Sequence, residues 1–163
     1  MSIYKKKTEI VNIMEAVFEI EFTDEQIGVL IADEDAIIKR QRGKTFVIAC
    51  KAILECLSND ESLILVVSRN KMQSKMMKDY INVLLHRLEE CIEMSYFIGT
   101  NEIKINQSTI KLKEDSRDSL RGYRQCFNYI LIDDADLVNN INSLFVNLLL
   151  LNVNSIVIGV RTD

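Results

Sequence analysis

Proline and tryptophan are absent from this chain of 163 residues, and histidine occurs once, at His86. Four cysteines are present, but no two of them form a CxxC pair. Without a CxxC pair and with a single histidine, the sequence has no spacing typical of a zinc site built from cysteine and histidine. The cysteines are also too dispersed for a secreted disulfide scaffold, so we expect reduced thiols in an intracellular protein.

Long apolar runs are absent as well. The longest, such as residues 148–151, fall far short of the roughly 20 residues that span a bilayer, so we expect no membrane contact. Lysines near the N-terminus are not followed by a long apolar stretch, and no signal peptide is expected. An excess of positive charge is also missing, because the net charge is −4. That balance disfavours a nucleic-acid binder that acts through a global positive field, while local patches stay open.

What is present is ordinary globular composition, with 48% apolar and 27% charged residues. The length suits one domain, so we treat residues 1–163 as a single unit. Apolar periodicity predicts helices at 4–20, from 45 to 58–60, at 70–91 and at 137–150, with Thr23 and Gln26 forming a capping box. Short apolar runs predict strands at 36–38, 62–67, 95–99, 128–132 and 155–160, and a hairpin from 103–105 and 109–112.

Strands that alternate with helices indicate an α/β fold with a mostly parallel sheet and a small β-hairpin insertion. Ligands bind such sheets at the carboxyl ends of the strands. Polar clusters at 39–45, 68–73 and 133–136 follow three of the predicted strands. We therefore expect the chemistry of this protein at that edge of the sheet.

The run KRQRGKT at residues 39–45 stands between a short apolar segment and a helix with an apolar face. Its end matches the second half of the phosphate-loop pattern GxxxxGK[ST], although Ile38 occupies the position of the first glycine. Such a loop directs backbone N–H groups at phosphate, and supplies a lysine for the outer phosphates and a hydroxyl for Mg²⁺. The candidate nucleotide-binding residues here are Arg40, Gln41, Arg42, Gly43, Lys44 and Thr45.

A second motif is the apolar strand YILI that ends in two carboxylates, Asp133 and Asp134. A phosphohydrolase needs one carboxylate near Mg²⁺ and another that orients the attacking water. Taken alone, the pair is better explained as the end of a strand that simply enters solvent. Together with GKT upstream in an α/β pattern, it indicates a magnesium-dependent nucleotide site.

The order of motifs resembles the ATPase domain of viral DNA-packaging terminase large subunits, from tailed phages and herpesviruses. The motifs are RQRGKT, SLILVV followed by Ser68-Arg69 and Gln73, NQSTIKL, the Ser119–Gly122 segment and ILIDDAD. The resemblance covers about residues 22–160 and implies a P-loop NTPase of the RecA/ASCE-like kind. It also implies ATP and Mg²⁺ as cofactors.

By this resemblance, Lys44 and Thr45 would bind the β- and γ-phosphates and Mg²⁺, and Asp133 would be the Mg²⁺-associated carboxylate. Arg40 would act in cis on the γ-phosphate. Arg121 would be a trans-acting finger between ring subunits. Arginine fingers can raise rates by roughly 10³–10⁵.

Gln26, with Phe22 nearby, resembles the upstream adenine-recognition element of the family. Its competing role is the capping box, and the two interpretations stay open at this point. The family's catalytic glutamate is replaced by Asp134, which is shorter by about 1.5 Å. Because a shift of about 1 Å can cost on the order of 10²-fold in rate, we expect a slow ATPase or one that binds nucleotide without turnover.

The resemblance implies a motor that couples ATP hydrolysis to packaging of double-stranded DNA, with other terminase subunits and the portal protein as partners. A homo-oligomeric ring would form on assembly, the isolated chain would be a monomer that binds DNA weakly, and the nuclease domain of the family is not in this sequence. The protein would act in the infected host cell, in the cytoplasm for a phage or in the nucleus for a herpesvirus-like virus. Two alternatives are a non-hydrolysing terminase-fold module for assembly and a helicase-like fragment.

Other residues have plainer predictions. We expect His86 at the surface, or in packing without catalysis. Cys50 and Cys56 should be core thiols on the helix after the loop. The methionines at 72, 76 and 77 should pack against the sheet, and the lysines at 5–7 should be a solvated end, with a smaller chance of touching DNA. Asp136 is interpreted as a helix cap.

Overall fold

The computed structural model describes residues 3–34, 36–38, 43–114, 127–133 and 156–160. For residues 3–5, 36–38, 44 and 156–160 it describes the backbone path alone. The predicted helix at 137–150, the Ser119–Gly122 segment and the predicted cap Asp136 lie outside the described residues. Cys126 lies outside them too.

The described elements follow the predicted order. The helices are α1 (Ile3–Phe18), α2 (Asp24–Ile31), α3 (Lys44–Ser58) and α4 (Lys71–Leu88). The strands are β1 (Ala36–Ile38), β2 (Leu63–Ser68), β3 (Tyr96–Ile98), β4 (Glu102–Ile105), β5 (Ser108–Glu114), β6 (Tyr129–Ile132) and β7 (Ile156–Val160). None of the helices described is long and apolar enough to cross a membrane.

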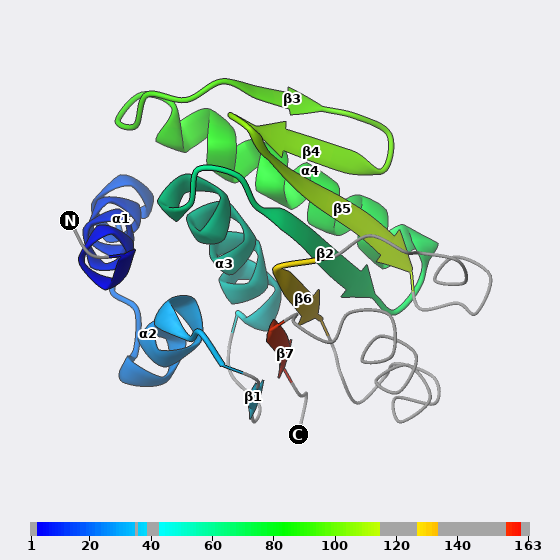
Figure 1. Ribbon diagram of the computed structural model, residues 1–163, viewed down its shortest axis with the longest axis horizontal. Helices are drawn as coiled ribbons and strands as arrows, with labels where there is room; N and C mark the ends of the chain where they lie inside the picture. The colour runs from blue at the N-terminus through cyan, green and yellow to red at the C-terminus, as the bar shows by residue number, and fades with distance from the viewer. Residues whose placement is uncertain (1–2, 35, 39–42, 115–126, 134–155, 161–163) are drawn as a thin grey trace.

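The strands form one sheet in the order β1-β7-β6-β2-β5-β4-β3 (Figure 1). The first five in that order are parallel to their neighbours, and β4 and β3 are added in antiparallel fashion. The predicted hairpin is therefore confirmed. Its strands are part of the main sheet, because β5 pairs with β2 as well as with β4. Strand β5 pairs with β2 from Leu63↔Thr109 to Ser68↔Glu114, which is longer than the predicted strand at 109–112.

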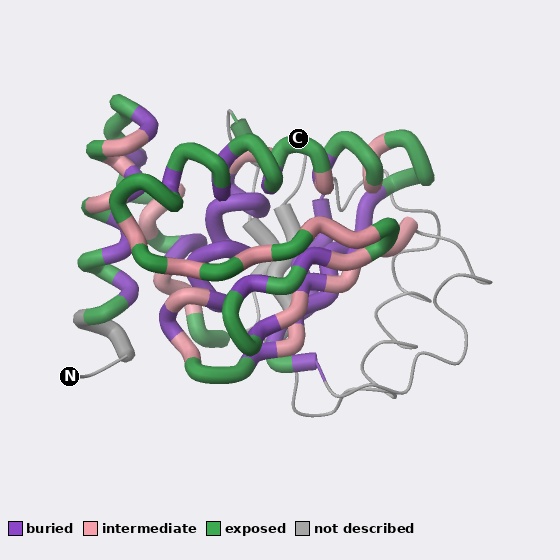
Figure 2. Tube along the Cα trace, turned by 90° about the horizontal axis from the view of Figure 1, so that it is seen from above, coloured by how far each residue is buried: buried purple, intermediate pink, exposed green. Residues whose placement is uncertain are grey.

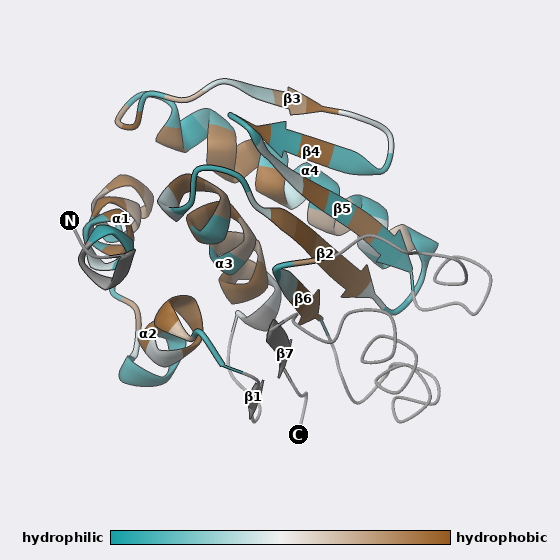
Figure 3. Cartoon of the chain, in the orientation of Figure 1, coloured by the Kyte–Doolittle hydropathy of each residue, from teal (hydrophilic) through white to brown (hydrophobic). Residues whose placement is uncertain are grey.

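Helices α3 and α4 pack on the sheet, and α1 and α2 pack on α3 as an outer layer (Figure 1). The central strands are apolar along their length, as Figure 3 shows for β2, because they are buried on both faces. The helix α3 is buried over almost its whole length, including Cys50 and Cys56, which are confirmed as core thiols. The core therefore lies between the central strands and α3.

Helix α2 begins with the predicted capping box. The side chain of Thr23 accepts a hydrogen bond from the Gln26 backbone N–H at 3.2 Å, and Gln26 Oε1 accepts one from the Thr23 N–H at 2.9 Å. The reciprocal bonds satisfy two N–H groups that a helix start leaves without intrahelical partners. The N-cap prediction is confirmed.

Helix α4 corrects the prediction for the methionines. Met77 is buried, but Met72 and Met76 have exposed fractions of 70% and 55%. These two residues belong to a stripe that continues through Tyr80 and Val83 on the outer side of α4, where Figure 2 shows exposed residues. His86 is exposed, as expected, and its Nδ1 lies 3.1 Å from Glu89 Oε1.

Candidate functional site

The start of α3 provides a helix N-terminus at the carboxyl edge of the sheet. Gly43 is the N-cap residue and has φ 68°, a left-handed conformation in which a side chain would be strained. As a glycine, this N-cap residue has no side chain that could bond to the first N–H groups of the helix. The first N–H groups of α3 and its positive dipole end are therefore suited to an anion such as phosphate.

Thr45 and Asp133, which are 88 positions apart in sequence, meet at this edge. The Thr45 hydroxyl donates to the Asp133 carboxylate, with Oγ1 at 3.2 Å from Oδ2 and 3.5 Å from Oδ1. Asp133 follows β6, is only 3% exposed, and is held by a bond from its N–H to the carbonyl oxygen of Val67 at 3.0 Å. The structure thus brings together the two residues predicted to hold magnesium.

This donor set fits Mg²⁺. The ion prefers hard oxygen ligands and is usually held by one or two carboxylates together with substrate phosphates. A carboxylate and a hydroxyl lie here beside the end of a helix that suits phosphate. The magnesium assignment itself stays a prediction, because its support is the chemistry of these two side chains.

Most other predicted site residues lie outside the described part of the chain. This holds for Arg40, Gln41 and Arg42 in the loop, and for Arg121 and Asp134. Lys44 opens α3 with its backbone, and its side chain is not described. The roles predicted for these residues stay predictions.

Gln26 is described, and its side-chain oxygen is used in the capping box. That contact confirms the capping-box interpretation of Gln26. The other, adenine recognition, stays a prediction.

An aromatic cluster connects the start of α3 with the segment around Gln26. Phe46, which follows Thr45, stacks on Phe22 with ring centroids 5.8 Å apart and planes inclined by 24°. Phe18 and Tyr80 contact the same ring edge-to-face at 5.8 and 6.2 Å. The entry into α2 is therefore packed against the first turn of α3.

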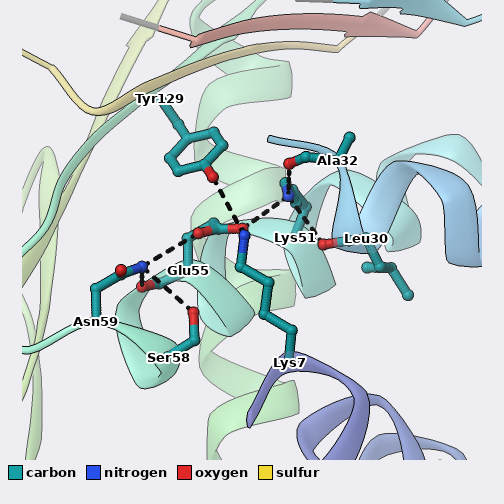
Figure 4. Close-up of polar contacts among 8 residues, drawn as sticks. All are labelled: Lys7, Leu30, Ala32, Lys51, Glu55, Ser58, Asn59 and Tyr129. Atoms are coloured by element: carbon teal, nitrogen blue, oxygen red, sulfur yellow. Dashed lines mark hydrogen bonds and ion pairs between the residues drawn. The ribbon is translucent and has the colours of Figure 1, made fainter. Parts of the chain in front are cut away.

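A buried charged network lies further along α3 (Figure 4). Glu55 Oε1 is 2.7 Å from Lys7 Nζ of α1 and 2.7 Å from Lys51 Nζ, and the side chains of Lys51 and Glu55 are fully buried. Lys7 Nζ also donates to the Tyr129 hydroxyl of β6 at 3.3 Å. The prediction of a solvated end is therefore wrong for Lys7, which is 4% exposed because Glu55 and Tyr129 offer it buried partners.

Lys51 also holds the end of α2. Its ammonium group donates to the carbonyl oxygens of Leu30 and Ala32 at 2.8 and 2.7 Å (Figure 4). The last turn of α2 contains no basic residue of its own. Lys51 therefore satisfies carbonyl groups that a helix end leaves open and places a positive charge at the negative end of the dipole.

Burial shifts the acid–base properties of this region. Desolvation lowers the pKa of Lys51 to about 8, against an opposing effect of Glu55. Desolvation, followed by the nearby Glu55 carboxylate, raises the pKa of the Tyr129 phenol. In both side chains, burial therefore disfavours the charged form.

Sequence reasoning missed Lys7, Lys51 and Glu55. Two of them carried a signal, since Lys51 and Glu55 are spaced i,i+4 inside an otherwise apolar stretch of helix. Lys7 carried none, because its partners lie far away in sequence and its neighbours are also lysines.

Comparison with protein-family models gives no match, and no curated protein matches the chain in sequence. Solved structures do match. The ATPase domain of the large terminase of Thermus phage P74-26 is similar with a TM-score of 0.68 at 13% identity, over 91% of this chain and 68% of that one.

Two further matches have TM-scores of 0.64 and 0.63. One is the large terminase of a thermophilic bacteriophage in complex with ADP, at 14% identity over 86% of this chain and 39% of that one. The other is the bacteriophage phi29 genome packaging motor assembly, at 12% identity over 87% of this chain and 47% of that one. The chain therefore spans less than half of these two proteins.

The chain has the fold of phage large-terminase ATPase domains. This confirms the predicted α/β class, with a mostly parallel sheet flanked by helices.

Proposed function

We propose that this chain is a magnesium-dependent ATPase domain of the terminase type, which couples ATP hydrolysis to the packaging of double-stranded viral DNA. The observation that carries the proposal is the contact between Thr45 and Asp133 beside the N-terminus of α3, which begins after Gly43. A hydroxyl, a carboxylate and a helix N-terminus meet there at the carboxyl edge of parallel strands. The likeness to terminase ATPase domains, one of them in complex with ADP, supports the same conclusion.

In this proposal each residue has one task. Thr45 and Asp133 hold Mg²⁺, which when bound neutralises phosphate charge. Lys44 and Arg40 contact the outer phosphates, with Gln41, Arg42 and Gly43 in the surrounding loop, and Gln26 contacts the base. Asp134 places the water for in-line attack on the γ-phosphate, and Arg121 acts on a neighbouring subunit.

The same proposal includes the partners. The domain would act in the infected host cell in a homo-oligomeric ring with other terminase subunits and the portal protein. Packaging motors among the structural matches support this assignment. The isolated chain would be a monomer.

Hydrolysis of ATP by the purified chain tests the proposal. Lys44→Ala should abolish nucleotide binding, because it removes the charge directed at the outer phosphates. Lys75→Ala is the matched control, since Lys75 is an exposed lysine on α4, and it should leave binding and turnover unchanged. If the wild-type chain does not bind nucleotide at all, the proposal is wrong.

Asp134→Glu tests the catalytic step. The longer side chain should raise kcat by up to about 10²-fold, because it moves the carboxylate by more than 1 Å towards the water. A wild-type chain that does not turn over but gains activity with Asp134→Glu would have a degenerate site.

That outcome corresponds to a second candidate function, a terminase-fold module that acts in assembly without hydrolysis. Two sequence features favour it, Ile38 in place of the first glycine of the loop and Asp134 in place of glutamate. In that case Lys44→Ala would leave partner binding unchanged.

A further inference from the structure

Ser68 is the last residue of β2, and its side chain is 1% exposed. Its Oγ is the buried side-chain polar atom that has no hydrogen-bond partner in the part of the chain described here. Buried hydroxyl groups in folded proteins are almost always hydrogen-bonded. A buried hydroxyl group without a hydrogen bond is therefore unusual at this position.

Another serine in the same sheet shows the usual arrangement. Ser108 on β5 is equally buried, and its Oγ accepts from the Ser62 N–H at 3.0 Å and donates to the Cys56 carbonyl oxygen at 3.4 Å. Ser68 is as deeply buried as Ser108 but has no such bonds among the described residues. An alanine would fit the same space in the strand and would leave no polar atom unsatisfied.

The register of the sheet places Ser68 beside the candidate magnesium site. Strands β2 and β6 are parallel and paired up to Val67↔Ile132, so one more residue on each strand puts Ser68 opposite Asp133. Neighbouring strands in a sheet are about 4.8 Å apart. Ser68 is therefore next to the carboxylate that Thr45 contacts.

The two side chains also share a face of the sheet. Ile64 and Val66 of β2 belong to the core cluster under the helices, as do Tyr129 and Leu131 of β6. Because side chains alternate along a strand, Ser68 and Asp133 point to that same face. The hydroxyl thus lies at the edge and on the face where α3 begins.

We propose that Ser68 is a positioning residue of the nucleotide site, whose hydroxyl holds a water molecule beside Asp133 when magnesium nucleotide is bound. This inference rests on the proposed function. It explains why an otherwise costly unpaired hydroxyl stands at this position: its partner arrives with the ligand. The sequence placed Ser68 in the polar cluster after β2, and neither that cluster nor the resemblance to terminases predicted this role for it.

The test uses two opposite effects of Ser68→Ala. Without ligand, the variant should melt about 2–4 °C above the wild type, because it removes an unsatisfied buried polar group. With Mg²⁺ and ATP, the rise in Tm caused by the ligand should be smaller than in the wild type. Turnover, where the wild type shows it, should fall roughly 10- to 100-fold as the water loses its position.

Ser108→Ala is the matched control. It removes an equally buried hydroxyl that is already bonded, so the Tm should fall while the ligand-induced rise and the turnover stay as in the wild type. Ser68→Thr keeps a hydroxyl and should retain more of the turnover than Ser68→Ala.

Two negative results are distinguishable. If Mg²⁺ and ATP do not raise the Tm of the wild-type chain, both the proposed function and the role of Ser68 are overturned. If the ligand does raise the Tm of the wild type, and Ser68→Ala shows the same rise in Tm and the same turnover, only the role of Ser68 is overturned. A lower Tm of ligand-free Ser68→Ala with unchanged turnover would show a structural hydroxyl and would also overturn it.

Discussion

Lys51 occupies a site where a charged group is costly and yet well bonded. Its Nζ has three acceptors within 2.8 Å, the carboxylate of Glu55 and two carbonyl oxygens at the end of α2. Removal from water nevertheless lowers its pKa to about 8 from the ordinary 10.5. The folded chain therefore releases this proton at a lower pH than the unfolded chain does.

The sign of the stability effect follows from proton counting. Between pH 8 and 10.5 the unfolded chain binds more protons at Lys51 than the folded chain, so the free energy of unfolding rises with pH. The buried thiols of Cys50 and Cys56 act in the opposite direction. Burial raises their pKa from 9.0, so above about pH 9 the unfolded chain loses these protons first and stability falls.

The window in which Lys51 dominates is therefore pH 8–9. We expect the free energy of unfolding of the wild type to rise across this window, by at most about 1.4 kcal/mol. Lys51→Met should lack the rise. Urea denaturation at closely spaced pH values measures both.

Lys7→Met is the matched control, because it removes the other ammonium partner of Glu55 and leaves the bonds to α2 in place. It should lower stability and keep an upward slope in this window. The same slope in Lys51→Met as in the wild type would contradict the assignment of the pH effect to Lys51.

Helix α4 carries two apolar stripes, and only one of them faces the core. Met77, Ile81 and Leu84 lie on the buried stripe. Met72, Met76 and Tyr80 lie on the exposed one. Both have helical spacing, so the sequence alone does not distinguish them; the choice depends on how the helix sits against β2 and β5.

Truncation of adjacent methionines separates the two stripes. Met77→Ala should lower the free energy of unfolding by about 2–5 kcal/mol, because it leaves a cavity in the core. Met76→Ala should change it by no more than about 0.5 kcal/mol, as is usual for exposed positions. Urea denaturation of both variants decides, and equal losses would contradict the orientation of α4.

How much of an element the sequence predicts depends on the range of its interactions. The capping box of α2 was predicted to the residue because Thr23 and Gln26 are three positions apart and need nothing else. The burial of Lys7 was not, since it depends on Glu55 and Tyr129, which α3 and β6 bring to it. The unpaired hydroxyl of Ser68 was also beyond the sequence, because a missing bond is visible only in the folded chain.

At the scale of the whole molecule, the meeting of Thr45 and Asp133 follows from the parallel sheet. Each residue comes shortly after a strand, β1 or β6, and the carboxyl ends of parallel strands share an edge. The sequence does not give the order of the strands. It therefore does not show that β7 separates β1 from β6, or that β5 joins the parallel part of the sheet.

The charge of the whole chain predicts weak binding to DNA. With a net charge of −4, the isolated chain should bind duplex DNA no more tightly than a typical non-specific protein, with Kd of about 10⁻⁴–10⁻⁶ M or weaker at physiological salt. Fluorescence anisotropy with labelled duplexes at several salt concentrations measures this. Labelled single strands are the comparison, and tighter binding to them would favour the helicase-like alternative.

The pairing of β1 with β7 has a consequence for the order of folding. Among the described strands β1 has no other neighbour, and Ala36 is opposite Ile158. During synthesis the hairpin of β4 and β5 can form from local contacts, whereas β1 must wait until residues 156–160 have left the ribosome. Strand β1 is thus placed last, so the edge of the sheet at which we propose that nucleotide binds is completed only after residues 156–160 have been made.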